Sequence, residues 1–162
     1  LFLKKYTNAE TEFLTAIKIK KTNPDSLLHL GIIYIETKNE KKAIQFLEKS
    51  LKFNPSFTES FYNLGLCYKN LGDFQKAIEY YKKAIKSNLN HFKSYNNLGV
   101  CYLSINDYKN AIDILTQCLE KYPEYSLALN NLGSVNLALK KYNEAEIKKQ
   151  IKIIFGLIYL YK

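Results

Sequence analysis

The side chains best suited to acid–base, nucleophilic or metal chemistry are few and scattered in this chain of 162 residues. His29 and His91 are 62 positions apart, and no His or Cys pair has a spacing typical of zinc or haem sites. The chain also lacks a glycine-rich phosphate loop. The sequence therefore predicts no catalytic residue, no metal site and no cofactor.

The three cysteines have a simpler interpretation as small buried apolar residues. Cys67 and Cys101 are 34 positions apart, a spacing that recurs along the chain. Cys118 likewise stands 34 positions after Ala84. Equivalent positions in neighbouring helical units stand about 8–10 Å apart, beyond the roughly 7 Å that a disulfide spans between Cα atoms. We expect reduced thiols, which favour a cytoplasmic protein.

A column of asparagines is the strongest candidate for binding. Asn63, Asn97 and Asn131 follow one another at the same spacing of 34 positions, and His29 stands 34 positions before Asn63. Asn is less favourable than Ala inside a helix by roughly 0.5–0.7 kcal/mol, so its recurrence needs a cause. Amide groups match a peptide backbone and could form a ladder that holds an extended chain. The alternative is that these amides are solvated, or bonded to Asn96, Asn130 or the next turn.

The elements that must position this column follow from a 34-residue repeat. Gly31, Gly65, Gly99 and Gly133 mark it, with Leu before each glycine, Tyr three residues after most, and Ala twelve residues after. Apolar residues at i, i+3, i+4 and i+7 indicate a helix through each glycine, and a second helix carries the Ala. Each unit is predicted to be a helical hairpin with Gly and Ala at the crossing.

These hairpins divide the chain into predicted segments. Residues 1–22 are interpreted as the C-terminal part of a first unit, followed by units 24–57, 58–91 and 92–125 and by the start of a last unit, 126–146. Together they would form four hairpins and a leading half-unit.

Residues 147–162 depart from the repeat and are predicted to form an atypical apolar C-terminal helix. Its apolar stripe comprises Ile147, Ile151, Ile154, Ile158 and Tyr161. Repeat arrays often end in atypical elements, although non-native sequence would explain the departure equally well. A stripe of this size predicts self-association through residues 147–162.

The pattern of a large residue, Leu-Gly, Tyr, Ala and Pro resembles the tetratricopeptide repeat (TPR) family. Phe61, Leu64, Gly65, Tyr68 and Ala77 carry it in one unit, and Pro55 and Pro123 stand after the second helices of two units. The resemblance implies an all-α, right-handed superhelical solenoid of antiparallel helix hairpins, with the first helices lining a concave groove. It also implies a peptide-binding groove formed by His29, Glu59, Tyr62, Asn63, Lys69, Lys93, Asn96, Asn97, Asn130 and Asn131.

Two known features of TPR proteins bear on this groove. The asparagine column is similar to the Asn ladder in the repeat region of O-linked N-acetylglucosamine transferases. The carboxylate clamp of co-chaperone members would need Lys and Asn where this chain has Leu28 and Ile32, and only Asn63 and Lys93 fit. We therefore expect no carboxylate clamp.

Composition limits the partners. The formal net charge is +9, yet all 24 basic residues are Lys, so the two-pronged Arg donor that reads bases and clamps phosphates is missing. The lysines fall mainly on second helices, away from the groove, which favours a solvated face over a nucleic-acid site. No apolar stretch approaches the roughly 20 residues of a membrane span, and no secretory signal is visible.

The sequence thus predicts a non-enzymatic, cytoplasmic scaffold that binds a protein or peptide in its concave groove. Two alternatives stay open. One is the substrate-recognition region of an enzyme resembling O-linked N-acetylglucosamine transferase whose catalytic domain is absent here, and the other is a structural module that stacks between subunits of a large assembly.

Overall fold

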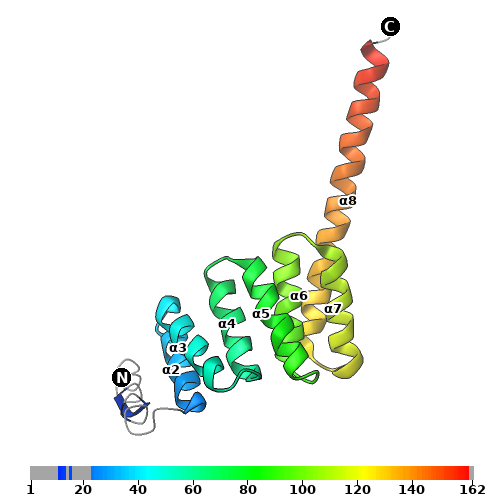
Figure 1. Ribbon diagram of the computed structural model, residues 1–162. Coiled ribbons are helices and arrows are strands. Elements are labelled where there is room, and N and C mark those ends of the chain that lie inside the picture. Colours follow the sequence, from blue (N-terminus) through cyan, green and yellow to red (C-terminus); the bar gives the residue numbers. More distant parts are fainter. Residues whose placement is uncertain (1–10, 14, 16–22, 161–162) are drawn as a thin grey trace.

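The computed structural model describes residues 11–13, 15 and 23–160, with the backbone alone for residues 145, 148 and 150–160. Within this part of the chain every regular element is a helix. The elements are α2 (Pro24–Glu36), α3 (Glu40–Phe53), α4 (Thr58–Asn70), α5 (Phe74–Ser87), α6 (Phe92–Ser104), α7 (Tyr108–Lys121) and α8 (Ser126–Leu160). Three antiparallel hairpins, α2/α3, α4/α5 and α6/α7, stack in chain order, and α8 follows (Figure 1). The predicted all-α solenoid is confirmed.

Side-chain caps define where most of these helices begin. The oxygens of Asn23, Asn39, Asp73 and Asp107 accept hydrogen bonds from backbone N–H groups in the first turn of α2, α3, α5 and α7. Such a cap satisfies a donor that the helix cannot, and is worth about 1 kcal/mol. Pro24 begins α2, where its missing N–H costs nothing. Pro55 and Pro123 follow the ends of α3 and α7, as predicted.

The turn inside each hairpin contains one residue in the left-handed region. Lys38, Gly72 and Asn106 occupy equivalent positions, with φ of 57°, 77° and 60°. Glycine and asparagine adopt this conformation readily. Lys38 shows that the turn also forms around a less suitable residue, here followed by the capping side chain of Asn39.

The repeat glycines hold the two helices of each hairpin together. A Cβ placed on Gly31, Gly65 or Gly99 would lie 2.5–2.7 Å from a side chain sixteen residues later, which is Leu47, Tyr81 or Leu115 respectively. The sequence predicted Gly opposite Ala at this crossing. The structure differs, because the large side chain fills the space above the glycine. Ala43, Ala77 and Ala111, twelve residues after these glycines, are nevertheless fully buried.

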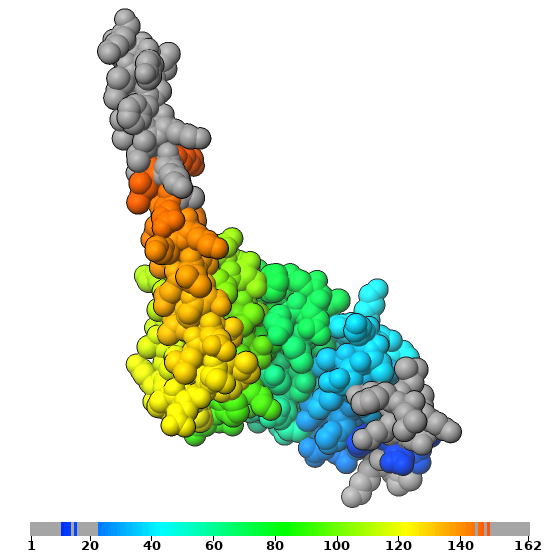
Figure 2. Space-filling view, turned by 180° about the vertical axis from the view of Figure 1, so that it is seen from behind, coloured from blue at the N-terminus to red at the C-terminus, as the bar shows by residue number. Residues whose placement is uncertain are grey.

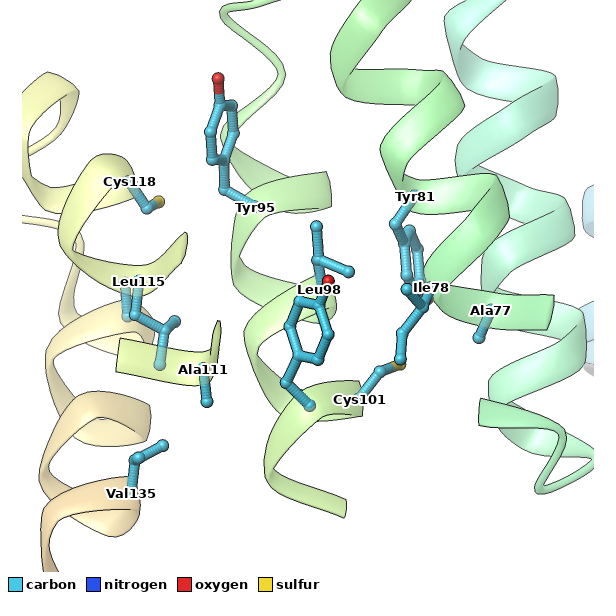
Figure 3. Close-up of a cluster of buried hydrophobic side chains, with 12 residues drawn as sticks. Ala77, Ile78, Tyr81, Tyr95, Leu98, Cys101, Ala111, Leu115, Cys118 and Val135 are labelled. Atoms are coloured by element: carbon cyan, nitrogen blue, oxygen red, sulfur yellow. The ribbon is translucent and has the colours of Figure 1, made fainter. Parts of the chain in front are cut away.

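The core runs continuously from one hairpin into the next. In Figure 3, Tyr81 and Cys101 approach each other from α5 and α6, while Leu115 and Cys118 of α7 face α6 from the other side. All four side chains are fully buried. The first helices α4 and α6 are therefore each packed between their own second helix and that of the preceding unit.

The predicted fourth hairpin does not form, which corrects the division into 126–146 and 147–162. α8 continues without a turn from Ser126 to Leu160 and projects beyond the stacked hairpins (Figure 1). The cap explains the difference, because the residue equivalent to Asn39, Asp73 and Asp107 is Lys141. Lysine accepts no hydrogen bond from a backbone N–H and favours a helix interior, so nothing stops the helix there.

Two predictions fall wholly or partly outside the described residues. Of the leading half-unit 1–22, only residues 11–13 and 15 are described, and there the ring of Phe13 stacks on His29 of α2 with centroids 5.1 Å apart. Of the C-terminal apolar stripe, only the side chain of Ile147 is described, and it is 56% exposed. Self-association through residues 147–162 therefore stays a prediction.

The crossing at Gly99 can be tested by exchanging large and small residues. We expect Gly99→Leu to lower the free energy of unfolding by about 1–3 kcal/mol, because its side chain would need the space that Leu115 fills. Leu115→Ala should cost about 2–5 kcal/mol through the cavity it leaves. The double variant should recover part of the summed loss, since the large residue has moved to the other helix. Urea unfolding measures all three, and strictly additive losses would contradict this crossing.

The hydroxyl of Tyr81 is buried without a hydrogen-bond partner among the described residues. Burial also raises the pKa of this phenol. Tyr81→Phe removes the unsatisfied group, so we expect the free energy of unfolding to rise by about 1–3 kcal/mol. Tyr95→Phe is the matched control, because the Tyr95 hydroxyl donates to the Leu89 carbonyl at 3.3 Å and its loss should be neutral or destabilising. Thermal unfolding of both variants compares them, and a less stable Tyr81→Phe would show that the hydroxyl has a partner.

Candidate functional site

The predicted asparagine column lies on the first helices, and its last two members, Asn97 and Asn131, each join their helix to the first helix before it. The side-chain amide of Asn97 in α6 donates to the Tyr62 hydroxyl in α4 at 3.3 Å. The amide of Asn131 in α8 donates to the Asn96 oxygen in α6 at 2.8 Å. Both bonds connect residues 35 positions apart. One face of α4, α6 and α8 therefore carries a polar strip, which we call the column face.

Lys69 adds a cation to the column face. Its Nζ donates to the Asn97 oxygen at 2.9 Å, so Lys69 and Tyr62, both from α4, bind the two ends of one amide. Partial burial lowers the pKa of Lys69 and raises the pKa of Tyr62, because removal of water disfavours the charged form of each. The sequence placed Lys69, Tyr62 and Asn97 in one groove, but it did not predict these bonds.

The first two members of the column behave differently. Asn63 is 7% exposed, and its amide donates to the Glu59 carbonyl of its own helix at 2.7 Å. The residue 35 positions earlier is Leu28, which offers no acceptor. His29 is exposed, and its described contact is the stack on Phe13. The column thus becomes a strip linked between helices only from α4 onward.

His91, Ser94 and Glu59 form a cluster whose order resembles a hydrolase triad. The His91 Nδ1 lies 2.7 Å from the Ser94 Oγ, and its Nε2 lies 3.3 Å from a Glu59 carboxylate oxygen. Ser94 is fully buried, so a substrate cannot reach its hydroxyl. Tyr62 packs edge-on against the imidazole. The cluster fixes the start of α6 against α4 and provides no accessible nucleophile.

The remaining predicted groove residues lie beside this strip. Asn96 is 7% exposed and accepts the bond from Asn131. Glu59, Lys93 and Asn130 are exposed, and the Lys93 carbonyl accepts a second bond from the Asn97 amide at 3.1 Å. The exposed groups carry both signs of charge, so the strip is neither a basic nor an acidic channel.

An aromatic cavity that the sequence analysis missed lies between the start of α6 and the turn that joins α7 to α8. Its volume is about 500 Å³, and Phe92, Tyr122 and Tyr125 line it together with Lys121, Pro123 and Glu124. The rings of Tyr122 and Tyr125 lie 5.3 and 5.0 Å from the Phe92 ring, centroid to centroid. The sequence signal was the pair of tyrosines flanking Pro123, which the repeat does not require.

Several lysines of the second helices lie over aromatic rings. The pairs Lys42–Tyr34 and Lys76–Tyr68 occupy equivalent positions in two hairpins, with Nζ to centroid distances of 5.0 and 5.1 Å. Lys49 on Phe46 and Lys83 on Tyr80 repeat in the same way. Such contacts are worth about 0.5–1 kcal/mol at exposed sites. Part of the positive charge therefore has a packing role that the sequence analysis did not predict.

The cysteines are buried and free, as predicted for small core residues. Burial raises the pKa of the Cys67 thiol to about 12 and that of the Cys101 thiol to about 11. Among the described residues, no group of three His, Cys, Asp or Glu side chains could hold a metal ion. The same part of the chain contains no helix long and apolar enough to cross a membrane.

Comparison with known proteins identifies the family to which this architecture belongs. A family model described as the tetratricopeptide repeat protein 21 C-terminal ARM domain matches residues 3–131. The crystal structure of MamA is similar, with a TM-score of 0.76 and 23% identity over 93% of this chain and 92% of that one. No curated protein matches the chain in sequence.

Two further solved structures share the fold. YrrB, a TPR protein with an unusual peptide-binding site, has a TM-score of 0.70 and 23% identity over 80% of this chain and 66% of that one. The first TPR of Spaghetti (RPAP3), bound to the HSP90 peptide SRMEEVD, has a TM-score of 0.69 and 22% identity over 72% and 93%. At these identities the likeness concerns the fold.

The raised thiol pKa values predict a loss of stability in alkali. An unfolded cysteine loses its proton near pH 9, whereas Cys67 and Cys101 keep theirs in the folded protein. The free energy of unfolding should therefore hold steady below pH 9 and fall above it, by about 1.4 kcal/mol per pH unit for each thiol. Urea unfolding between pH 8 and 10 measures the slope. Cys67→Ala and Cys101→Ala should each reduce it, and an unchanged slope in both would contradict this assignment.

Proposed function

Because this chain belongs to the family of the tetratricopeptide repeat protein 21 C-terminal ARM domain, we propose that it is a non-enzymatic protein-interaction module. Its ligand is an extended peptide or a partner helix, bound along the column face of α4, α6 and α8 with α2 at one end. The observation that carries this proposal is the polar strip, in which amides from successive helices are held in fixed positions by bonds between residues 35 positions apart.

The strip leaves defined groups for a ligand. The amides of Asn97 and Asn131 donate within the chain, whereas the side-chain oxygen of Asn131 accepts no hydrogen bond among the described residues. Lys93 and Asn130 are exposed beside it. A peptide N–H could bind the Asn131 oxygen, and Lys93 could bind a peptide carbonyl. Preorganised groups of this kind lose little entropy on binding.

The similar structures support a peptide ligand without identifying it. Peptide binding is a property of YrrB and of the Spaghetti TPR bound to the HSP90 peptide. For this chain we propose a groove that does not read an acidic terminus, because Leu28 is buried and Ile32 is half-buried where the carboxylate clamp needs polar side chains. The aromatic cavity at Phe92 offers a separate place for an apolar side chain of the ligand.

The substrate-recognition alternative requires amides free to bind a peptide along the whole column. In this structure the amides of Asn63, Asn97 and Asn131 all donate within the chain. This favours a general interaction module over a ladder like that of O-linked N-acetylglucosamine transferases. Buried, reduced cysteines support a cytoplasmic location, and we propose no nucleic-acid ligand because the column face carries mixed charge.

A random peptide library displayed on phage tests the groove without assuming a ligand. We expect the full chain to select peptides, and the double variant Asn97→Ala, Asn131→Ala to bind a selected peptide at least about 10-fold more weakly by fluorescence anisotropy. Loss of the bond between the ligand and the Asn131 oxygen, worth about 0.5–1.5 kcal/mol, and loosening of Tyr62 and Lys69, which Asn97 holds in place, account for this change.

Asn143→Ala is the matched control, because Asn143 is an exposed asparagine on the overhanging part of α8. Its affinity should equal that of the unchanged chain. Circular dichroism must show that the double variant is folded at the assay temperature. If the folded double variant binds as tightly as the control, the column holds the fold only and the groove proposal fails.

A further inference from the structure

In each of the three hairpins, a second helix covers the glycine face of the first helix. The corresponding face in the first half of α8 is bare. A Cβ on Gly133 would meet nothing within 4 Å, in contrast to the close contacts at Gly31, Gly65 and Gly99. Leu129 and Leu137, one turn before and after, are 49% and 64% exposed. Among their equivalents in other units, Leu27, Tyr95 and Ile35 are 4%, 3% and 9% exposed. Figure 2 shows this part of α8, in yellow to orange, on the outside of the stacked hairpins.

The residues of this bare face follow from helix geometry. Ser126, Leu129, Asn130, Asn136, Leu137 and Lys140 lie within about 60° on either side of Gly133 at 100° per residue. All of them are exposed. Glycine destabilises a helix interior relative to alanine, and here no contact within the described part of the chain requires it. Its presence is explained if another backbone approaches this point closely.

The sequence around Gly133 reads almost the same in both directions. Residues 127–130 are Leu-Ala-Leu-Asn and residues 136–139 are Asn-Leu-Ala-Leu, so positions three to six residues from the glycine are identical on the two sides. In a two-fold antiparallel contact centred on Gly133, a residue k positions before the glycine in one copy faces the residue k positions after it in the other, so this sequence pairs Leu with Leu and Asn with Asn. An antiparallel pair centred on Gly133 places Leu129 against Leu137 of the second copy.

We propose that two copies of this chain dimerise through this face, with antiparallel α8 helices crossing at Gly133. The glycines of the two copies meet at the two-fold axis and allow the backbones to approach. Leu129 of each copy then packs against Leu137 of the other, so this contact forms once on either side of the axis. Asn130 of one helix faces Asn136 of the other, where two amides can pair. Asn130 borders both surfaces, whereas the other residues of the contact lie on a different face of α8 from Asn131 of the peptide groove.

Charge and length agree with a second copy as the occupant. Residues 126–139 contain no charged side chain, and depletion of charge is typical of the centre of an interface. Lys140 of one copy faces Ser126 of the other, and the two Lys140 side chains lie about 20 Å apart along the axis, beyond the Debye length of about 8 Å. The fifteen residues from 126 to 140 match the 13–14 residues of helices paired in the existing hairpins.

The chain's own C-terminal segment fits this face poorly. At the repeat spacing, the residue above Gly133 would be Lys149, where the other hairpins have Leu47, Tyr81 and Leu115. Closing the fourth hairpin would therefore place a lysine in the crossing, and desolvation of its charge opposes this. In the structure Lys149 is exposed.

Sedimentation equilibrium of the full chain from 1 to 100 μM tests the proposal. We expect a dimer, and we expect Leu137→Glu to weaken it at least 10-fold, because the carboxylate would face Leu129 of the second copy. Leu127→Glu is the matched control, since Leu127 is 54% exposed on the same helix but lies about 120° from Gly133. This control should stay dimeric. A monomeric unchanged chain, or an equal effect of the two variants, would overturn the proposal.

Cross-linking tests the register independently of stability. Under mild oxidation, Gly133→Cys should form a disulfide-linked dimer, because the two Cα atoms at the axis lie within the roughly 7 Å that a disulfide spans. Leu127→Cys should not, and the three native cysteines are buried. Association that persists in Leu137→Glu, or dimers linked equally well through position 127, would place the contact elsewhere, for example at residues 147–162, and would refute this face.

Discussion

The structure depends on one packing contact, the large side chain that covers a repeat glycine. Leu47, Tyr81 and Leu115 each lie where a Cβ on the glycine sixteen residues earlier would have to be. The missing Cβ lets the two helices of a hairpin approach, and the large side chain excludes any void between them. Because this contact recurs in all three hairpins, it fixes the same angle and register in each of them.

The column face is a consequence of that regularity. Identical hairpins bring successive first helices side by side with a constant offset, so residue n+35 of one helix meets residue n of the helix before it. This offset joins Asn97 to Tyr62 and Asn131 to Asn96. Hydrogen bonds between units stiffen the solenoid, while exposed groups such as Lys93 remain available to a ligand. One set of asparagines can therefore serve both the fold and the groove.

The repeat ends where a helix cap is missing. Three hairpins turn where Asn39, Asp73 and Asp107 accept backbone hydrogen bonds, and α8 continues through Lys141. The absence of a cap worth about 1 kcal/mol favours a continuous helix over a turn. The residues around Lys141 also favour a helix. The consequence reaches far beyond the turn, because the missing second helix leaves the face around Gly133 uncovered.

The sequence by itself determined the helices of the three hairpins, the place of the glycines at their crossings, the buried cysteines and the placement of the asparagine column on the first helices. These features depend on neighbours within one or two turns, which periodicity, caps and prolines encode directly. Only the tertiary structure decided that Lys69 and Tyr62 bind the two ends of the Asn97 amide, that Asn63 turns back to Glu59, and that α8 does not fold back. The first two depend on the offset between stacked units, and the third on a balance between a missing cap and a missing partner for Gly133. Spacing along the chain does not encode the distance between two helices, and that distance selects the partner of each polar group.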